Sequence, residues 1–316
     1  MSSETTDFYK FISSIFLSLS FIAVLIVGRE SVSFLRNTPP VGFRGNWINN
    51  CNLVVAGDSR SAFAVNPELL VLKNHYKGRN FSFNGNALSR KYLEMVSALL
   101  VTDNPRVIIF GLTPHMFAPH AFKDNAFMHY KPPSLGERIF SRIFGDKFNL
   151  FSTMTMSEIR YIISRGQYKR PIEIYSNSTG WMEAYHNIPD NEASELKSYA
   201  RNFQFGPVKQ DVIQYFLKMV REWSSQGIVV IAFRPPTTES MVKLENQESG
   251  FDEDLFVKMF EQAGGYWINV PQYGVYRCYD GSHITADSAL ALSRYLASEI
   301  CTRIPVLKES LCADSL

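Results

Sequence analysis

The sequence lacks an excess of charge of one sign. Its 32 Lys and Arg residues nearly balance its 30 Asp and Glu residues, which leaves a formal net charge of +2 over 316 residues. The basic residues are also scattered along the chain rather than clustered. Domains that bind nucleic acids carry a basic patch or stripe that neutralises phosphates. The charge balance therefore argues against a nucleic-acid partner.

Cysteine is scarce, and its spacing does not match that of a metal site. The four cysteines are Cys51, Cys278, Cys301 and Cys312. We therefore expect no metal, and the chemistry predicted below needs no cofactor. Cys51 precedes the first predicted strand, and the last predicted helix returns toward the same edge of the sheet. One hypothesis is a disulfide from Cys51 to Cys301 or Cys312, and the other is that the cysteines are buried and unpaired.

One long stretch lacks charge altogether, and it lies near the N-terminus. Residues 11–28 read FISSIFLSLSFIAVLIVG, which is close to the shortest length that spans a bilayer as a helix. No small-x-small cleavage site follows, because Arg29 and Glu30 come at once. We predict a single-pass signal anchor, with residues 1–10 in the cytoplasm and the globular part outside it. A cleaved signal peptide and a buried core helix are the alternatives.

Short apolar runs bounded by turn formers predict five buried strands. They are residues 53–56, 80–83, 107–110, 228–233 and 266–270. Segments with apolar residues at helical spacing alternate with these runs and predict helices. They are residues 67–77, 89–102, 207–226, 251–263 and 285–300. The alternation predicts an α/β fold, a three-layer doubly wound sheet of about five parallel strands in flavodoxin-like order.

The regular alternation is interrupted once. Residues 112–205 show no βα rhythm, and this stretch is too long for a structureless loop in a compact domain. We therefore predict an α/β domain over residues 51–304 with an insertion after its third strand. The insertion contains two further predicted helices, residues 157–165 and 191–201. The flanking segments are a predicted linker at residues 29–50, which is rich in Pro and Gly, and a C-terminal tail at residues 305–316.

Ser59 follows the first predicted strand directly, in a Gly57-Asp58-Ser59-Arg60 turn. In open α/β sheets, ligands bind outside the carboxyl ends of the strands. A serine nucleophile needs a base to take its proton, and the base needs an acid to hold its tautomer. Asp280 and His283 stand in a turn before the last predicted helix, so both can face that cleft. Taken alone, an Asp-x-x-His pair is more typical of an ordinary turn and helix cap than of a catalytic pair.

Three blocks of the sequence together resemble the SGNH (GDSL-type) hydrolase family. They are Gly57-Asp58-Ser59, Gly85 after the second strand, and Asp280-Gly281-Ser282-His283 before the last helix. The resemblance covers residues 52–117 and 205–304. The Gly-Asp-Ser-Arg turn and the Gly-Leu-x-Pro run at residues 111–114 are most similar to membrane-anchored bacterial members that act on cell-surface polysaccharides. Examples are the D-alanyl transfer protein of teichoic acid modification and alginate-type acetylation proteins. Many such members partner a multipass membrane O-acyltransferase.

The resemblance implies roles for individual residues. Ser59 would be the nucleophile, His283 the general base, and Asp280 the group that orients the imidazole. The backbone N–H groups of Ser59 and Gly85 would bind the developing oxyanion, and a side chain at position 85 would block close approach. The alternative for Gly85 is a turn glycine with positive φ.

The sequence departs from the family pattern at the third block, which usually supplies an asparagine as a further oxyanion donor. Thr113 stands in that region, and its hydroxyl is the candidate substitute. Asn84 and Asn86 could also lean in from the neighbouring loop. Loss of one such donor costs about 100- to 1,000-fold in rate, so we expect weak activity unless another group replaces it.

Two arginines are candidate substrate contacts. Arg60 follows the nucleophile directly, and Arg234 ends the fourth predicted strand at the functional edge of the sheet. For both, a structural role is the alternative.

Together these features predict a bacterial cell-envelope serine esterase or O-acyltransferase. It would act on acyl groups, expected to be acetyl, of an extracytoplasmic glycan through an acyl-serine intermediate. The alternatives are a catalytically degraded scaffold or binding subunit of a membrane O-acyltransferase system, and a lipase that acts on membrane lipid.

Overall fold

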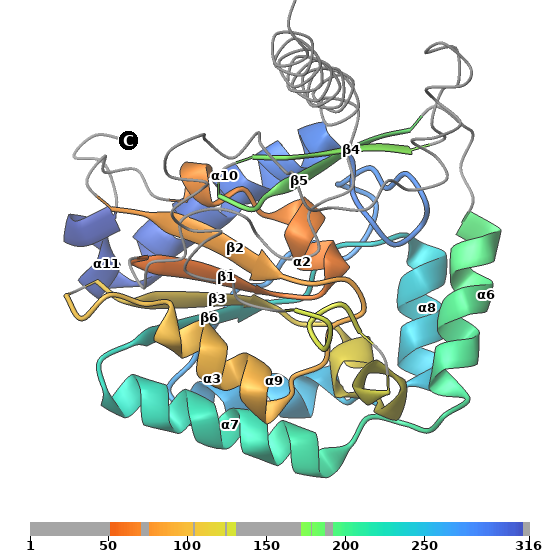
Figure 1. Cartoon of the computed structure of the whole chain (residues 1–316), viewed down its shortest axis with the longest axis horizontal. Coiled ribbons are helices and arrows are strands. Elements are labelled where there is room, and N and C mark those ends of the chain that lie inside the picture. Colours follow the sequence, from red (N-terminus) through yellow and green to blue (C-terminus); the bar gives the residue numbers. More distant parts are fainter. Residues whose placement is uncertain are drawn as a thin grey trace, which may run out of the picture. The chain divides into compact units, whose positions relative to one another are not determined.

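A five-stranded parallel sheet forms the centre of the computed structural model (Figure 1). The structure describes residues 51–70, 76–103, 105–123, 125–130, 172–177, 179–186 and 192–311. Across the sheet the strands run in the order β2-β1-β3-β6-β7. Their bounds are Leu53–Gly57 for β1, Gly78–Ser82 for β2, Val107–Gly111 for β3, Val229–Phe233 for β6 and Tyr266–Trp267 for β7. The predicted parallel α/β sheet is confirmed, and the second strand lies outside the first, as in the flavodoxin-like order.

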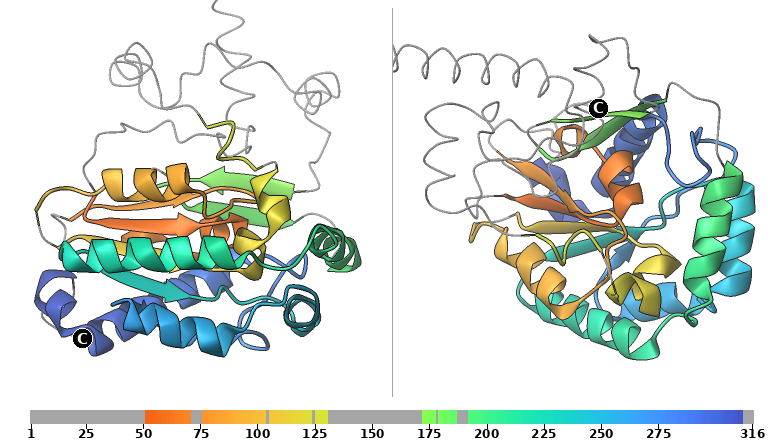
Figure 2. Two further views of the ribbon diagram at one scale, coloured as in Figure 1. Left: turned by 90° about the horizontal axis from the view of Figure 1, so that it is seen from below. Right: turned by 45° about the vertical axis from the view of Figure 1, so that its right-hand side comes forward.

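Both faces of the sheet are covered by helices, because the strands are apolar on both faces. Val54 and Ala56 of β1 point into one core, and Leu53 and Val55 point into the other. Figures 1 and 2 show the two helical layers. The first contains α3 (Arg90–Ala98), α7 (Gln210–Ser225) and α9 (Glu253–Gln262). The second contains α2 (Ser59–Ala64), α10 (Ala286–Arg303) and α11 (Pro305–Leu311).

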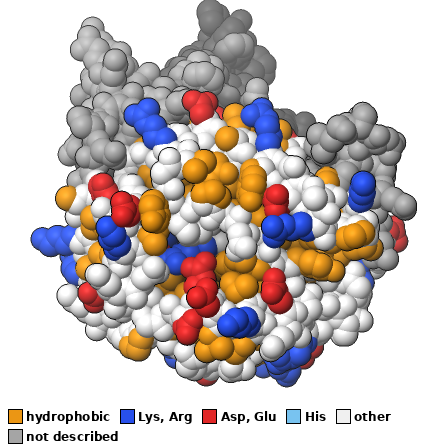
Figure 3. All heavy atoms as spheres, turned by 180° about the vertical axis from the view of Figure 1, so that it is seen from behind, with side chains coloured by type: hydrophobic (Ala, Val, Ile, Leu, Met, Phe, Trp, Pro, Cys, Tyr) orange, Lys and Arg blue, Asp and Glu red, His pale blue; other side chains and the backbone are white. Residues whose placement is uncertain are grey.

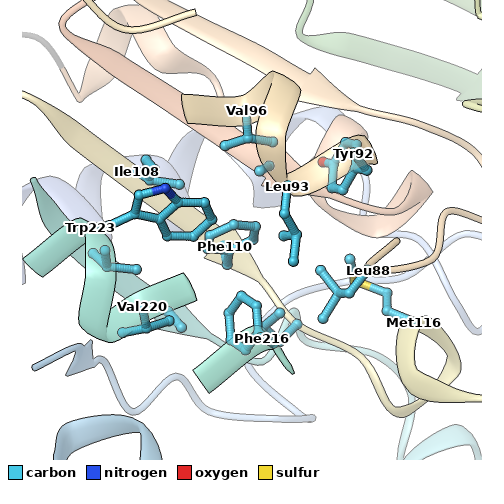
Figure 4. Packing of buried hydrophobic residues seen from close by; sticks show 14 of the residues in the cluster. Leu88, Tyr92, Leu93, Val96, Ile108, Phe110, Met116, Phe216, Val220 and Trp223 are labelled. Atoms are coloured by element: carbon cyan, nitrogen blue, oxygen red, sulfur yellow. The ribbon is translucent and has the colours of Figure 1, made fainter. Parts of the chain in front are cut away.

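Aromatic packing fixes the first layer against the sheet (Figure 4). Phe110 of β3 meets Phe216 of α7 edge to face at 5.1 Å between ring centroids, and it stacks on Trp223 at 6.0 Å. Such pairs add about 0.5–1.5 kcal/mol each beyond the area that they bury. The register of β1 pairs Gly57 with Ser82 and with Gly111, so three strands end level at the carboxyl edge.

Further elements lie beside this framework. Helix α6 (Glu192–Phe203) packs on α8 (Glu239–Glu248) through a small apolar cluster, and strands β4 (Ile172–Ser176) and β5 (Met182–His186) form an antiparallel hairpin. The hairpin is attached next to α2, because the indole N–H of Trp181 donates to the carbonyl oxygen of Phe63 at 2.9 Å. Three short 3-10 turns complete the described elements: Pro67–Leu69, Pro114–Phe117 and Pro119–Phe122.

Several elements differ from the sequence-based expectation. Helices α2, α8 and α11 and the β4–β5 hairpin were not predicted, and α11 lies in the segment expected to be a C-terminal tail. Where a helix was expected at residues 67–77, the structure has a 3-10 turn over Pro67–Leu69, and residues 71–75 lie outside the described part. The fifth strand ends at Trp267 instead of residue 270. It is an edge strand, and Pro271 closely follows it without an N–H to continue a ladder.

Part of the predicted organisation falls outside the described residues. This applies to the N-terminal segments at residues 1–10, 11–28 and 29–50, and to the helix predicted at residues 157–165. Among the residues that the structure describes, no helix combines the length and apolarity needed to cross a membrane.

The cysteines do not pair as proposed. Cys51 is a thiol in the core beside β1, so neither disulfide proposed for it is formed. Cys301, on α10, is disulfide-bonded.

Candidate active site

Ser59 is the first residue of α2 and stands at the carboxyl edge of the sheet. The preceding Asp58 caps the helix, because its Oδ1 accepts the backbone N–H of Arg60 at 3.0 Å. Two glycines let the helix sit directly on the strand ends. A Cβ at Gly57 or Gly111 would lie 2.0 or 2.1 Å from the hydroxyl oxygen of Ser61. The Asp58 cap and the two glycines at the strand ends therefore set the position of Ser59.

The structure brings His283 and Asp280 to Ser59 in one hydrogen-bonded chain. His283 Nε2 lies 2.8 Å from Ser59 Oγ, and His283 Nδ1 lies 2.8 Å from Asp280 Oδ2. The other carboxylate oxygen, Asp280 Oδ1, accepts the backbone N–H groups of Ser282 at 2.9 Å and of His283 at 2.7 Å. The Asp-x-x-His spacing thus closes a turn in which the carboxylate holds both the loop and the imidazole.

The electrostatics keep Asp280 ionised. Burial acts to raise the pKa of Asp280, but the hydrogen bond and charge of His283 and the two backbone N–H donors outweigh it. The pKa of Asp280 therefore lies below its ordinary value. An ionised carboxylate here holds the proton on Nδ1, which leaves Nε2 free to accept the proton of Ser59.

Two aromatic rings confine the imidazole. Tyr279 stacks on His283 at 5.8 Å between ring centroids, with an interplanar angle of 15°. Phe63 of α2 meets the same imidazole edge to face at 5.2 Å. These contacts restrict rotation of the ring.

Gly85 lies in a loop that is bonded to the peptide just before the nucleophile turn. The Gly57 carbonyl oxygen accepts the backbone N–H of Phe83 at 3.2 Å and the side-chain amide of Asn86 at 3.1 Å. Gly85 has a φ of +62°, and a Cβ there would meet no atom within 4 Å. The positive φ, rather than crowding by the protein, is the local reason for glycine. Within the described residues, no acceptor is found for the backbone N–H of Ser59 or of Gly85.

The hydroxyl of Thr113, the candidate substitute for the missing asparagine, is taken up by a bond within the protein. Its hydroxyl is fully buried and donates its only proton to Asp58 Oδ2 at 2.6 Å. It therefore supports the helix cap, and its proton is directed at Asp58. Asn84 is exposed, while Asn86 is buried with its amide on Gly57. Neither asparagine is shown to reach Ser59.

The structure does not support the predicted substrate contacts at Arg60 and Arg234. Both side chains are buried, with 1% and 3% exposure. Arg60 Nη2 lies 2.7 Å from one carboxylate oxygen of Glu245, and Arg234 Nη2 lies 2.9 Å from the other. Helix α8, which carries Glu245, was not predicted, so nothing in the sequence indicated what would cover the two arginines.

Two buried residues that shape the site carry no recognisable motif. The Tyr92 hydroxyl accepts the backbone N–H of Gly57 at 2.8 Å and donates to the carbonyl oxygen of Phe81 at 2.8 Å. The Asn80 side-chain amide donates to the carbonyl oxygens of Ser61 at 3.0 Å and Val65 at 2.9 Å, at the end of α2. Asn80 is the first residue of the predicted strand at residues 80–83, in a β2 that reads Gly-Arg-Asn-Phe-Ser, so its position gave no signal. Tyr92 matched an ordinary helix-core position.

Comparison with known proteins does not assign the chain to a family. No protein-family model matches it, and no curated protein sequence does. Among solved structures, it is similar to a carbohydrate acetylesterase family member from Sinorhizobium meliloti, with a TM-score of 0.36 and 12% identity. The alignment covers 79% of this chain and 98% of that one. At that TM-score we draw neither fold nor activity from the likeness.

Proposed function

We propose that the chain is a serine esterase or O-acyltransferase that works through an acyl-Ser59 intermediate. The observation that carries this proposal is the hydrogen-bonded chain from Ser59 Oγ through His283 to Asp280, with both links at 2.8 Å. A nucleophile, a base and a group that orients the base are the components of nucleophilic acyl transfer.

In the first half-reaction, His283 Nε2 takes the proton of Ser59 as Oγ attacks the acyl carbonyl carbon. The negative charge that develops on the carbonyl oxygen is stabilised by the backbone N–H groups of Ser59 and Gly85. Asp280 stabilises the imidazolium that forms. The imidazolium then returns the proton to the leaving alkoxide, which departs as an alcohol and leaves the acyl group on Ser59.

In the second half-reaction, an incoming hydroxyl gives its proton to His283 and attacks the carbonyl carbon of the acyl-serine. The bond between that carbon and Ser59 Oγ then breaks, and the imidazolium returns the proton to Oγ. If the incoming hydroxyl belongs to water, the protein is an esterase, and if it belongs to a sugar, the protein is an acyltransferase. The chemistry at Ser59 is the same in both cases. With the hydroxyl proton of Thr113 committed to Asp58, the two backbone donors carry the oxyanion, and we expect slow turnover.

The test of this proposal is Ser59→Ala, with Ser97→Ala as the matched control. Ser97 is a serine on α3 whose hydroxyl donates within its own helix, to the Glu94 carbonyl oxygen. We expect the wild type and Ser97→Ala to hydrolyse p-nitrophenyl acetate and to be labelled by a fluorophosphonate. Ser59→Ala should lose the label and at least about 1,000-fold of the turnover, since removal of a triad member is that costly. Equal turnover in Ser59→Ala and the wild type would refute the proposal.

We further propose that the acyl group is acetyl, that the substrate is an extracytoplasmic glycan or other acylated polymer, and that residues 11–28 anchor the protein. The uncharged run at residues 11–28 supports the anchor. The disulfide at Cys301 agrees with an oxidising compartment. A multipass membrane O-acyltransferase is the proposed partner, on the strength of the sequence resemblance. The test is the acetyl content of the surface polymer in cells with Ser59→Ala, together with the membrane retention of a chain that lacks residues 1–29.

A catalytically degraded scaffold subunit is the second candidate. The bond from Thr113 to Asp58 favours it, because the site then lacks the side-chain donor of the SGNH pattern that the sequence resembles. Fluorophosphonate labelling separates the two candidates. Covalent modification of Ser59 would exclude the scaffold. The scaffold would be established if the wild type stays unlabelled and the Ser59→Ala variant still restores polymer acetylation in cells.

A further inference from the structure

Arg60, directly after the nucleophile, is bonded to the residue directly before the base. Arg60 Nε donates to Ser282 Oγ at 3.1 Å, across 222 residues of sequence. Ser282 is fully buried, and its hydroxyl donates onward to the Tyr199 hydroxyl at 3.1 Å. The backbone N–H of the same serine donates to Asp280 Oδ1 at 2.9 Å. Ser282 therefore accepts a hydrogen bond from Arg60 with its side chain and donates one to Asp280 with its main chain.

Both ends of Arg60 are fixed. Its backbone N–H is part of the Asp58 cap of α2, and its guanidinium carbon lies 4.8 Å from the centre of the Tyr199 ring. Burial acts to lower the pKa of Arg60, but the charge of Glu245 and its other neighbours raise it above the ordinary value. The side chain therefore stays charged. A charged, planar donor group held in this way is far more rigid than a lysine in the same place.

The opposite charge is anchored as well. Glu245 binds Arg60 with one oxygen and Arg234 with the other, at 2.7 and 2.9 Å. Arg234 is held in turn by Glu253 and by Asn246, the latter at 3.1 Å. Thr238 at the start of the same helix α8 donates its backbone N–H to the carbonyl oxygen of Gly281 at 3.2 Å. Helix α8 thus supports Arg60 and the Asp280–His283 loop together.

We propose that Arg60 is a positioning residue that sets the distance between Ser59 Oγ and His283 Nε2 through Ser282. The inference rests on the proposed function and deepens it. The turn that carries Ser59 and the loop that carries His283 come from opposite ends of the domain's sequence. Arg60, which follows Ser59, joins them through its side-chain bond to Ser282, which precedes His283. A misplacement of about 1 Å between reacting groups costs about 100-fold in rate.

The kinetic test compares Arg60→Met, Arg60→Lys, Ser282→Ala and the double variant Arg60→Met/Ser282→Ala. With p-nitrophenyl acetate we expect Arg60→Met to lower kcat by about 100-fold and to leave KM unchanged, because the buried side chain reaches no substrate. Arg60→Lys should recover little, since an ammonium lacks the planar fork. The double variant should lose no more than Arg60→Met, because both changes break the same link. A raised KM with unchanged kcat would overturn the proposal.

A second measurement does not depend on activity. Hydrogen exchange of a peptide over residues 279–285 reports the hydrogen bonds that Asp280 accepts from Ser282 and His283. We expect faster exchange there in Arg60→Met. Arg234→Met, the matched control, removes the other guanidinium from Glu245 and should leave this peptide unchanged. Unchanged exchange in Arg60→Met, or an equal increase in both variants, would overturn the proposal.

The two measurements separate the possible failures. A wild type with neither turnover nor fluorophosphonate label would refute the proposed function, while hydrogen exchange would still decide the role of Arg60. If Arg60→Met does not fold because Glu245 loses a partner, Arg60→Met/Glu245→Gln removes that charge, and it is then compared with Glu245→Gln alone.

Discussion

At the scale of single residues, burial decides what a polar side chain does. Thr113, Arg60 and Arg234 all stand where the sequence suggested contact with a substrate or an oxyanion. In the structure each is buried, and each is paired with a carboxylate of the chain. A buried charged or polar group needs such a partner, because an unmade bond there costs more than a made one contributes. These residues therefore stabilise the surroundings of the site from within the protein core.

Thr113→Val tests this assignment. The variant keeps the shape of the side chain and removes the bond to Asp58 Oδ2, so we expect a loss of about 1.5–3 kcal/mol in the free energy of unfolding. We expect kcat to fall by less than about tenfold, well short of the 100- to 1,000-fold typical of a lost oxyanion donor. Urea unfolding and p-nitrophenyl acetate kinetics measure the two effects.

The chain offers a matched control for Thr113→Val in Thr102→Val. The Thr102 hydroxyl faces Asp103 on the surface at 3.5 Å. A surface change of this kind should stay within about 0.5 kcal/mol of the wild type. If Thr113→Val instead loses kcat by 100-fold at unchanged stability, Thr113 contacts the oxyanion after all.

At the scale of elements, the short helix α2 depends on small residues beneath it. The Ser61 hydroxyl donates to the carbonyl oxygen of Gly111 at 3.0 Å. A Cβ at Gly111 would also lie 3.0 Å from Pro235 Cγ. Only a strand that ends in glycine leaves room for the helix, so the position of Ser59 is set by β3 as well as by β1.

Gly111→Ala should therefore displace α2. We expect an overpacking cost of about 1–3 kcal/mol and, because Ser59 moves with the helix, a fall in kcat of about 100-fold. Adding Ser61→Gly removes the clashing atoms and should recover part of kcat, although glycine in a helix itself costs about 1 kcal/mol. Thermal unfolding and kinetics on the single and double variants check this. Wild-type kcat in Gly111→Ala would show that α2 is not seated as described.

At the scale of the whole molecule, charge is distributed differently on the surface and in the interior. On the face opposite to that of Figure 1, basic and acidic side chains intermingle with small apolar groups, and neither sign forms a continuous field (Figure 3). This agrees with the net charge of +2. Inside, by contrast, Arg60, Glu245 and Arg234 concentrate charge behind the site.

This buried charge makes stability depend on pH in the acid range. Burial acts to raise the pKa of Glu245, but Arg60 and Arg234 outweigh it, so the pKa of Glu245 lies below its ordinary value of 4.5. The unfolded chain then binds more protons than the folded chain just below that value. The contribution of Glu245 to stability is therefore fully present above about pH 5 and is lost as pH falls through the lowered pKa.

Glu245→Gln tests this prediction. We expect it to be less stable than the wild type by about 3–5 kcal/mol at pH 7, since it breaks a buried ion pair, and we expect the gap to narrow as pH falls below about 5. Glu248→Gln, on the exposed side of the same helix, should track the wild type at every pH. Urea unfolding across this range measures the gap. A constant gap would show that Glu245 titrates in the folded chain as it does in the unfolded one.

Much of the fold could be predicted from local sequence. The strands at Leu53–Gly57 and Val107–Gly111 are apolar runs that end in glycine, and Thr285 caps α10 as expected. The three residues of the hydrogen-bonded chain could also be named, because a serine after a strand and an Asp-x-x-His turn before a helix are short-range patterns. Helix α8 escaped prediction, since its apolar residues are few and its role is to carry Glu245.

What the sequence by itself determined is the parallel α/β framework and the three residues that meet at its carboxyl edge, because apolar periodicity, caps and turns act within a few residues. What only the tertiary structure decided is the direction in which Arg60, Thr113 and Arg234 point. Their partners, Ser282, Asp58 and Glu245, come from other elements of the fold. A charged side chain next to a nucleophile looks the same in sequence whether it faces a substrate or a buried carboxylate. The free energy of burial, which depends on what packs above it, settles the choice.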